Sequence, residues 1–196
     1  MDFMIQLSHI QDAQTLLKTV VRHTPLDFST TFSQMASAQV YLKLENLQKT
    51  GSFKIRGAYN KISSLKKKDK KNGVVCSSAG NHAQGVAYAA TKMKVKSTIF
   101  MPIFAAASKV MATRGYGAEV ILEGETYDDA YAAAKKFADE TGAFFIHAFN
   151  DDLVIAGQGT VGLEIYEDLK DVEMVLVPVG GGGLISGVAV ALKNLK

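Results

Sequence analysis

The chain is poor in cysteine, proline and tryptophan, and it carries no strong charge of either sign. Its 196 residues include one cysteine, three prolines and no tryptophan. The lone Cys76 excludes an intramolecular disulfide framework, which fits the reducing cytoplasm where we expect the protein to work. The formal net charge of +3, without a basic patch interleaved with aromatic residues, argues against a nucleic-acid partner.

Long apolar runs are also missing. No stretch approaches the roughly 20 apolar residues that a membrane helix needs, so we expect no membrane partner. The first four residues lack a basic region followed by an apolar stretch, so we expect no secretory signal. Hydrophobic residues make up 47% of the chain and charged residues 21%, which is enough apolar material for a packed core.

Strand-like and helix-like segments alternate along most of the chain. Strands are predicted at residues 40–44, 74–77, 97–101, 118–122, 143–147 and 173–179. Helices are predicted at residues 54–65, 82–93, 106–114, 127–140, 155–169 and 184–195. Ser52 and Thr126 are placed to cap two of these helices. This alternation predicts an α/β fold with parallel sheets flanked by helices.

Two breaks in the pattern suggest two domains. The lysine-rich run at residues 66–71, closed by Asn72 and Gly73, is typical of a solvated linker or helix end. A second boundary lies near residues 149–153. We therefore expect residues 72–149 to form a small inserted α/β domain, and residues 1–71 and 150–196 to form parts of a larger domain.

Three segments carry the chemistry. Lys54 lies in the segment at residues 52–58, and two glycine-rich turns follow at residues 78–85 and 180–184. A lysine amine forms an imine with an aldehyde, and backbone N–H groups at a helix start bind a phosphate. Pyridoxal phosphate carries both groups, so the three segments together predict a site for this cofactor.

Each segment also has a simpler interpretation. Lys54 alone could be a surface lysine, and Asn81 alone could be the N-cap of a helix. The glycine run at residues 180–183 could be a close strand–helix turn. It does not match a dinucleotide fingerprint, and Val188 stands where a triphosphate-binding loop needs a lysine after Gly187. The four histidines show no metal-ligand spacing, so we expect no metal.

The combination resembles the fold-type II pyridoxal-phosphate enzymes, and within them threonine dehydratase (threonine ammonia-lyase), especially its short catabolic form. The resemblance runs from about residue 15 to the C-terminus. It is carried by residues 46–58, 77–85, 112–120, 156–160 and 178–184. A two-domain architecture with an incomplete large domain is implied, because the chain ends well before the catalytic domains of this family do.

The resemblance also implies residue roles. Lys54 would hold pyridoxal phosphate as a Schiff base and later act at the substrate Cα. Phe53 would pack near the cofactor ring, and Asn81 would bond its hydroxyl oxygen. The cofactor phosphate would lie on Gly180, Gly181, Gly182, Gly183 and Leu184, and the substrate carboxylate on Ser78, Ala79, Asn81 and His82.

The implied reaction is the deamination of L-threonine, and also of L-serine, to a 2-oxo acid and ammonia by a homo-oligomer, a dimer or tetramer. Serine racemase or serine dehydratase is one alternative. Eukaryotic racemases look to carry a serine where this chain has Ala79, which cannot titrate, and this favours elimination. A non-catalytic fragment of the same fold is the other alternative, and we expect little dehydratase activity from the 196-residue chain. Ala148 replaces a proline usual in such sequences.

Overall fold

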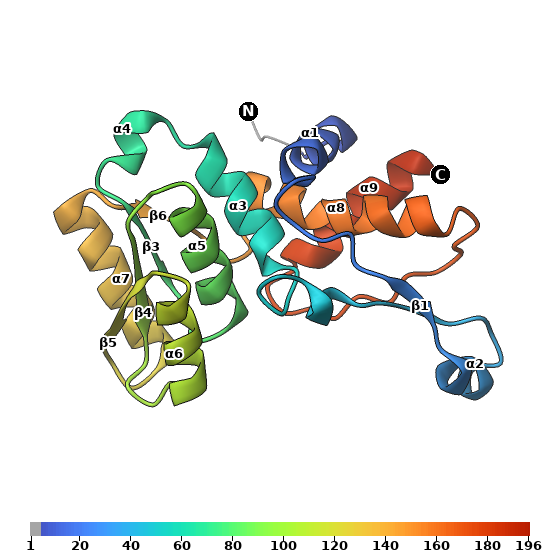
Figure 1. Cartoon of the computed structure of the whole chain (residues 1–196), viewed down its shortest axis with the longest axis horizontal. Coiled ribbons are helices and arrows are strands. Elements are labelled where there is room, and N and C mark those ends of the chain that lie inside the picture. Colours follow the sequence, from blue (N-terminus) through green and yellow to red (C-terminus); the bar gives the residue numbers. More distant parts are fainter. Residues whose placement is uncertain (1–4) are drawn as a thin grey trace.

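The structure is a computed structural model that describes residues 5–196. It contains a four-stranded sheet flanked by helices, a group of helices beside it and a separate two-stranded sheet (Figure 1). The strands are β1 (Leu26–Phe28), β2 (Tyr41–Lys43), β3 (Val74–Ser77), β4 (Ser97–Met101), β5 (Glu119–Leu122) and β6 (Phe144–Phe145). The helices are α1 (Leu7–Leu17), α2 (Thr30–Ala36), α3 (Lys54–Ser64), α4 (Lys67–Lys70), α5 (Asn81–Lys92), α6 (Ala107–Gly115), α7 (Tyr127–Thr141), α8 (Asp152–Asp168) and α9 (Gly183–Leu195), with a 3-10 helix, η1, at Glu45–Leu47.

The larger sheet is parallel, as the sequence predicts. Its strand order is β5-β4-β3-β6, and Val75 of β3 pairs with Thr98 on one side and Phe145 on the other. Helices α5 and α6 cover one face and α7 covers the other (Figure 1). Because both faces are covered, β3 and β4 are buried along their whole length, which is why they read as short apolar runs.

The predicted helix caps have different outcomes. Thr126 caps α7 as predicted: its hydroxyl accepts from the Asp129 N–H at 3.2 Å, and the Asp129 carboxylate accepts from the Thr126 N–H at 2.9 Å. The prediction for Ser52 is wrong, because Phe53 is the N-cap of α3 and no side chain caps that helix. Ser52 lies one residue before the N-cap, and its Oγ accepts a hydrogen bond from the backbone N–H of Lys54 at 3.4 Å.

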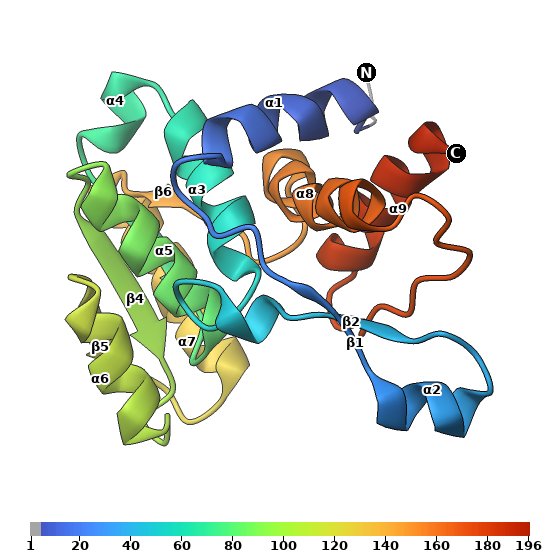
Figure 2. The same ribbon diagram turned by 45° about the vertical axis from the view of Figure 1, so that its right-hand side comes forward.

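Helices α1, α3, α8 and α9 pack together beside the sheet (Figure 2). α3 contacts both α5 and α8, so it joins this helical layer to the sheet. The small antiparallel pair β1–β2 lies beyond, with Leu26 opposite Lys43. All four parallel strands fall within residues 74–145, and the division of the chain into domains at residues 71 and 149 stays a prediction.

Glycines allow α8 to approach its neighbours closely. A Cβ on Gly157 would lie 2.6 Å from both the Arg56 carbonyl oxygen and the Gly57 Cα, on the backbone of α3. A Cβ on Gly187 would lie 2.5 Å from the Ile155 carbonyl oxygen, so α9 is equally close to α8. Side chains at these positions would push the helices apart, because backbone atoms cannot rotate away.

We expect Gly157→Ala to lower the free energy of unfolding by about 2 kcal/mol, because overpacking outweighs the gain in helix propensity. Gly115→Ala is the control, since Gly115 is also a helical glycine, the last residue of α6, but has no atom within 4 Å of its Cβ position. That variant should change stability by less than about 0.5 kcal/mol. Urea denaturation measures both, and equal stability of the two variants would contradict the packing argument.

The prediction of a strand at residues 173–179 is wrong. The segment has no strand structure. Met174 and Leu176 are 77% and 87% exposed, whereas Val175 and Val177 pack against α8 and α9. A strand needs a neighbour for its N–H and C=O groups, and no strand formed by residues 5–196 pairs with this segment. Among these same residues, no helix is long and apolar enough to cross a membrane.

Candidate functional site

Lys54 is the first residue of α3, and its side chain is half-buried at the meeting point of the sheet and the helical layer. Its Nζ donates a hydrogen bond to the Ala148 carbonyl oxygen at 2.8 Å and lies 5.4 Å from the centre of the Phe53 ring. Burial lowers the pKa of the Lys54 amine below its ordinary value. A larger fraction of this amine is therefore neutral, which is the nucleophilic form.

The turn after β6, at residues 146–150, contacts each part of the site. The Ile146 carbonyl oxygen lies 3.1 Å from the His82 Nε2, and the Ala148 carbonyl oxygen accepts from Lys54. The Phe149 ring occupies the space beside Gly181, where a Cβ would lie 2.2 Å from its Cγ. One short segment thus links Lys54, the loop before α5 and the glycine turn before α9.

His82 is buried and neutral. A carbonyl oxygen only accepts hydrogen bonds, so the His82 Nε2 carries the proton and Nδ1 is the unprotonated nitrogen. Nδ1 is buried and has no hydrogen-bond partner among the described residues. Burial, the largest effect, and the nearby charges of Lys54 and His147 together lower the pKa of His82 to about 4, although the hydrogen bond to the Ile146 carbonyl oxygen opposes them. The His82 Nδ1 is therefore a buried hydrogen-bond acceptor next to the loop before α5.

The loop at residues 78–82 turns from β3 into α5. Gly80 is the N-cap of α5, and no side chain caps this helix, so Asn81 is its first residue and not its cap. Ser78 and Ala79 are half-buried in the loop, and the Ser78 Oγ accepts from the Gly80 N–H at 3.3 Å. A Cβ on Gly85 would lie 3.0 Å from the Lys54 carbonyl carbon, so the starts of α5 and α3 lie side by side.

The glycine turn leads into α9. Gly182 is the N-cap of this helix, has a left-handed backbone with φ of +85°, and is not assisted by a capping side chain. The Cβ positions of Gly180 and Gly182 have no atom within 4 Å, whereas Gly183 is buried against Phe149. Uncapped N–H groups at a helix start, with open space before them, are suited to bind a phosphate.

Phe53 and Leu184 lie in one apolar cluster with Val161, Ile165 and Val188. This cluster brings the residue before Lys54 together with the residue after the glycine turn. The segments predicted from the sequence are thus gathered: Lys54, the loop before α5 and the glycine turn all reach the turn at residues 146–150. The binding roles given to individual residues stay predictions.

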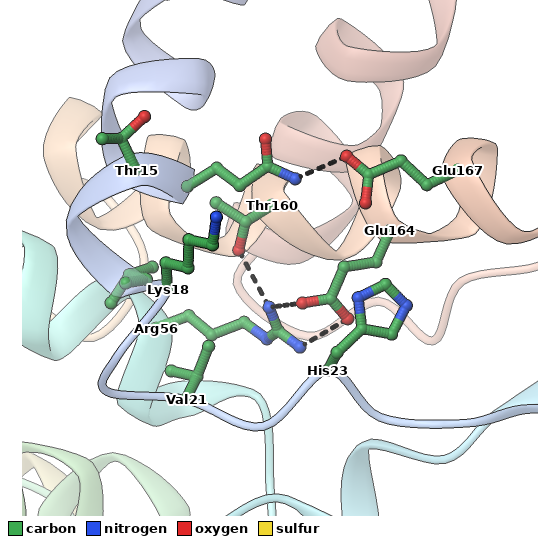
Figure 3. A pocket seen from close by; sticks show the side chains of 10 residues that line it. Thr15, Lys18, Val21, His23, Arg56, Thr160, Glu164 and Glu167 are labelled. Atoms are coloured by element: carbon green, nitrogen blue, oxygen red, sulfur yellow. Dashed lines mark hydrogen bonds and ion pairs between the residues drawn. The ribbon is translucent and has the colours of Figure 1, made fainter.

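The opposite side of α3 carries a buried ion cluster. Residues two apart on a helix point about 200° from each other, so Arg56 lies on the side away from Lys54. The guanidinium of Arg56 is completely buried, 2.6 Å from the nearest Glu164 oxygen and 2.7 Å from the nearest Glu45 oxygen. It also donates to the Thr160 Oγ1 at 3.1 Å (Figure 3). The cluster fixes α3 to α8 and to η1.

A cavity of about 480 Å³ lies above this cluster, between the end of α1 and α8 (Figure 3). Its floor is formed by Arg56, Thr160 and Glu164, whose polar atoms bond to each other. Lys18 and His23 stand at its rim. Because the buried polar groups of the floor already have partners, they are not free to bond a ligand in this cavity. The site on the Lys54 side is therefore the better candidate.

Sequence reasoning missed the turn at residues 146–150. It acts through backbone carbonyl oxygens and through the Phe149 ring, which leave no motif. The buried partners of Arg56 were missed as well, because they come from distant parts of the chain. Among residues 5–196 there is no group of three or more acidic, histidine or cysteine side chains placed to hold a metal ion.

The site fits a ligand that carries an aldehyde and a phosphate. The Lys54 amine is desolvated, and its hydrogen-bond partner is a neutral group, the Ala148 carbonyl oxygen. The Gly180 and Gly182 positions are open, and the start of α9 is uncapped. Lys54 can thus bind an aldehyde and the start of α9 a phosphate, and pyridoxal phosphate carries both groups.

Comparison with known proteins agrees with this chemistry. An L-threonine ammonia-lyase of Thermotoga maritima is 59% identical over 193 residues, which are 98% of this chain and 48% of that protein. The catabolic L-threonine dehydratase of Escherichia coli K12 is 46% identical over 195 residues, which are 100% of this chain and 59% of that protein. The chain thus spans about half the length of these relatives.

A solved structure has the same fold. Maize serine racemase superposes with a TM-score of 0.95 at 39% identity, over 98% of this chain and 59% of that one. The family model described as "Pyridoxal-phosphate dependent enzyme" matches residues 17–196. The chain belongs to the family of pyridoxal-phosphate dependent enzymes.

Proposed function

We propose that the protein is a pyridoxal-phosphate dependent ammonia-lyase that converts L-threonine to 2-oxobutanoate and ammonia, and L-serine to pyruvate and ammonia. The observation that carries the proposal is the desolvated Lys54 amine, held by the Ala148 carbonyl oxygen between two uncapped helix starts. The relatives named L-threonine ammonia-lyase and L-threonine dehydratase support the choice of substrate.

Each part of the site has a task in this reaction. Pyridoxal phosphate, when bound, takes up the electrons left at the substrate Cα. The Lys54 amine removes the Cα proton, and its lowered pKa keeps part of it neutral for this purpose. The N–H groups of residues 180–184 bind the cofactor phosphate, and Phe53 packs near the ring. Loss of the β-hydroxyl as water, followed by hydrolysis, releases ammonia and the 2-oxo acid.

The loop before α5 binds the remaining groups. The N–H groups of Ala79, Asn81 and His82 donate to the substrate carboxylate. The Ser78 N–H already donates to the Phe100 carbonyl oxygen, so Ser78 donates from its hydroxyl. The Asn81 side-chain amide donates to the hydroxyl oxygen attached to the cofactor ring. Neutral His82 adds no positive charge beside Lys54, so it does not lower the pKa of that amine further.

We also propose that the protein is a homo-oligomer, a dimer or tetramer, and that it is cytoplasmic. Exposed apolar side chains at Phe104 and Met111, next to and within α6, support association. The single buried Cys76 supports a reducing compartment.

Serine racemization is the second candidate, and the likeness to maize serine racemase favours it. Racemization needs an acid or base on each face of the substrate Cα, whereas Ala79 offers no titratable group in the loop before α5. This absence is the reason for preferring elimination.

Incubation with pyridoxal phosphate and either amino acid tests the proposal, in a protein of the full length of the relatives, of which this chain spans about half. We expect 2-oxobutanoate from L-threonine and pyruvate from L-serine, both measured by reduction with a coupled dehydrogenase, and no D-serine by chiral chromatography. D-Serine formed faster than pyruvate would instead identify a racemase. A protein that stays colourless with pyridoxal phosphate and produces neither product would be a non-catalytic member of the family.

A further inference from the structure

Within the turn at residues 146–150, the side chain of His147 bonds to the backbone of the two residues that end the turn. Its Nδ1 accepts hydrogen bonds from the Asn150 N–H at 3.0 Å and from the Phe149 N–H at 3.4 Å. Its ring meets the Phe149 ring edge to face, with 4.9 Å between the ring centres and an angle of 90° between the planes. His147 therefore contacts the backbone and the side chain that follow it.

The hydrogen bonds define the protonation state of this ring. Backbone N–H groups only donate, so the His147 Nδ1 must be unprotonated, and a neutral ring carries its proton on Nε2. A second proton, on Nδ1, would turn the acceptor into a donor facing two donors. Protonated His147 is therefore incompatible with the observed turn.

The turn at residues 146–150 orients two parts of the proposed cofactor site. The Ala148 carbonyl oxygen, next to His147, accepts from the Lys54 Nζ. The Phe149 ring packs against the backbone of Gly181 and Gly183, at the start of α9. If the turn loosens, the lysine loses its partner and the glycine turn loses the ring that supports it.

We propose that His147 is a positioning residue: as a neutral acceptor it holds the turn that orients Lys54 and the glycine turn, and acidification releases both. The charged groups that act on its ring are Asp151, at the start of α8, Lys135 of α7 and Lys54 of α3. The part of the inference that concerns cofactor binding rests on the proposed function, and the part that concerns the turn does not.

The direction of the pH effect follows from the surroundings of the ring. Burial, the largest effect, lowers the pKa of His147 below its ordinary value of 6.5; the charge of Asp151 opposes this, and the smaller effects of Lys135 and Lys54 add to it. His147 is thus neutral above pH 6.5 in both the folded and unfolded states. As the pH falls below 6.5 and through the lowered pKa of the folded state, the turn is lost.

Two variants separate the acceptor from the titration. His147→Asn keeps an acceptor oxygen, Oδ1, at the position of Nδ1 and cannot titrate near neutral pH. His147→Leu keeps the bulk and removes the acceptor. The first readout is amide hydrogen exchange of Phe149 and Asn150 by NMR, which needs no cofactor. The second is the Kd of pyridoxal phosphate, followed by absorbance between pH 5 and 8.

For the first readout, we expect the two amides to exchange about tenfold faster in His147→Leu, because each loses its hydrogen-bond acceptor, and at nearly the original rate in His147→Asn. For the second, the original protein should bind pyridoxal phosphate more weakly as the pH falls below 6.5. His147→Asn should lose this dependence relative to the original protein, and His147→Leu should bind about tenfold more weakly at every pH.

The outcomes are distinguishable. Unchanged exchange of Phe149 and Asn150 in His147→Leu would overturn the inference, whatever happens to cofactor binding. Faster exchange together with an unaltered Kd and an unaltered pH profile would also overturn it, because the turn would not orient the site. If no form of the protein, including the original, binds pyridoxal phosphate, the proposed function fails while the exchange data still test the turn.

Discussion

In a protein of the full length of the relatives, replacement of Lys54 by alanine should lower the formation of 2-oxobutanoate from L-threonine by about a thousandfold and leave the protein folded. The amine is both the covalent anchor and the base in the proposed reaction, so its loss removes two contributions at once. The side chain is only half-buried, and alanine is well tolerated in the first turn of α3, so the free energy of unfolding should change by less than about 1 kcal/mol. Coupled assays of turnover and urea denaturation measure the two effects.

Lys68→Ala is the control for this prediction. Lys68 lies exposed in the short helix α4, within the lysine-rich run, and has no part in the proposed site. The control should keep its turnover and its visible absorbance with pyridoxal phosphate. Full turnover in Lys54→Ala would remove Lys54 from the reaction and require another lysine to anchor the cofactor.

The parallel sheet could be predicted from local sequence because its strands are short, apolar and bounded by turn residues. β3 and β4 have the predicted bounds, since burial on both faces leaves an uninterrupted apolar run in each. The apolar run at residues 173–179 has the same local character and yet forms no strand. The composition of a segment can indicate that it suits a buried sheet. The hydrogen bonds of a strand depend on a neighbouring strand, which the segment itself does not specify.

The candidate site was predictable where it depends on residue type and not where it depends on backbone atoms. A lysine in a tight helix entry indicates imine chemistry, and a glycine run before a helix indicates phosphate binding. Lys54 and residues 180–184 could therefore be identified from the sequence. The carbonyl groups of Ile146 and Ala148 are common to all residues, and only the fold brings them to His82 and Lys54. The Ser52 cap failed for a related reason: one residue of offset at a helix start is beyond what the pattern resolves.

The buried ion cluster shows a third limit. Arg56 follows Lys54 by two residues and its sequence surroundings give no sign of burial, yet it is enclosed by carboxylates from η1 and α8. A charged side chain is almost never fully buried without partners, so the partners explain its position. They lie 11 and 108 residues away in the chain, a separation that no local pattern can reveal.

Replacement of Gly182 by aspartate should weaken the binding of pyridoxal phosphate strongly while the helix that follows is preserved or stabilised. Gly182 is the N-cap of α9, and an aspartate there satisfies free N–H groups and complements the helix dipole. The left-handed backbone, with φ of +85°, offsets part of this gain. The same carboxylate would occupy the open space before the helix and repel the cofactor phosphate.

Gly182→Asn isolates the charge, because asparagine has the same shape, the same capping ability and the same tolerance of a left-handed backbone. Two unit charges about 4 Å apart in partly screened surroundings repel by several kcal/mol, so the Kd of Gly182→Asp should exceed that of Gly182→Asn by roughly 100-fold. Urea denaturation of the two variants without cofactor should agree within about 0.5 kcal/mol. Equal Kd values in absorbance titrations would place the phosphate elsewhere, since an added negative charge at the start of α9 must be felt by a dianion bound there.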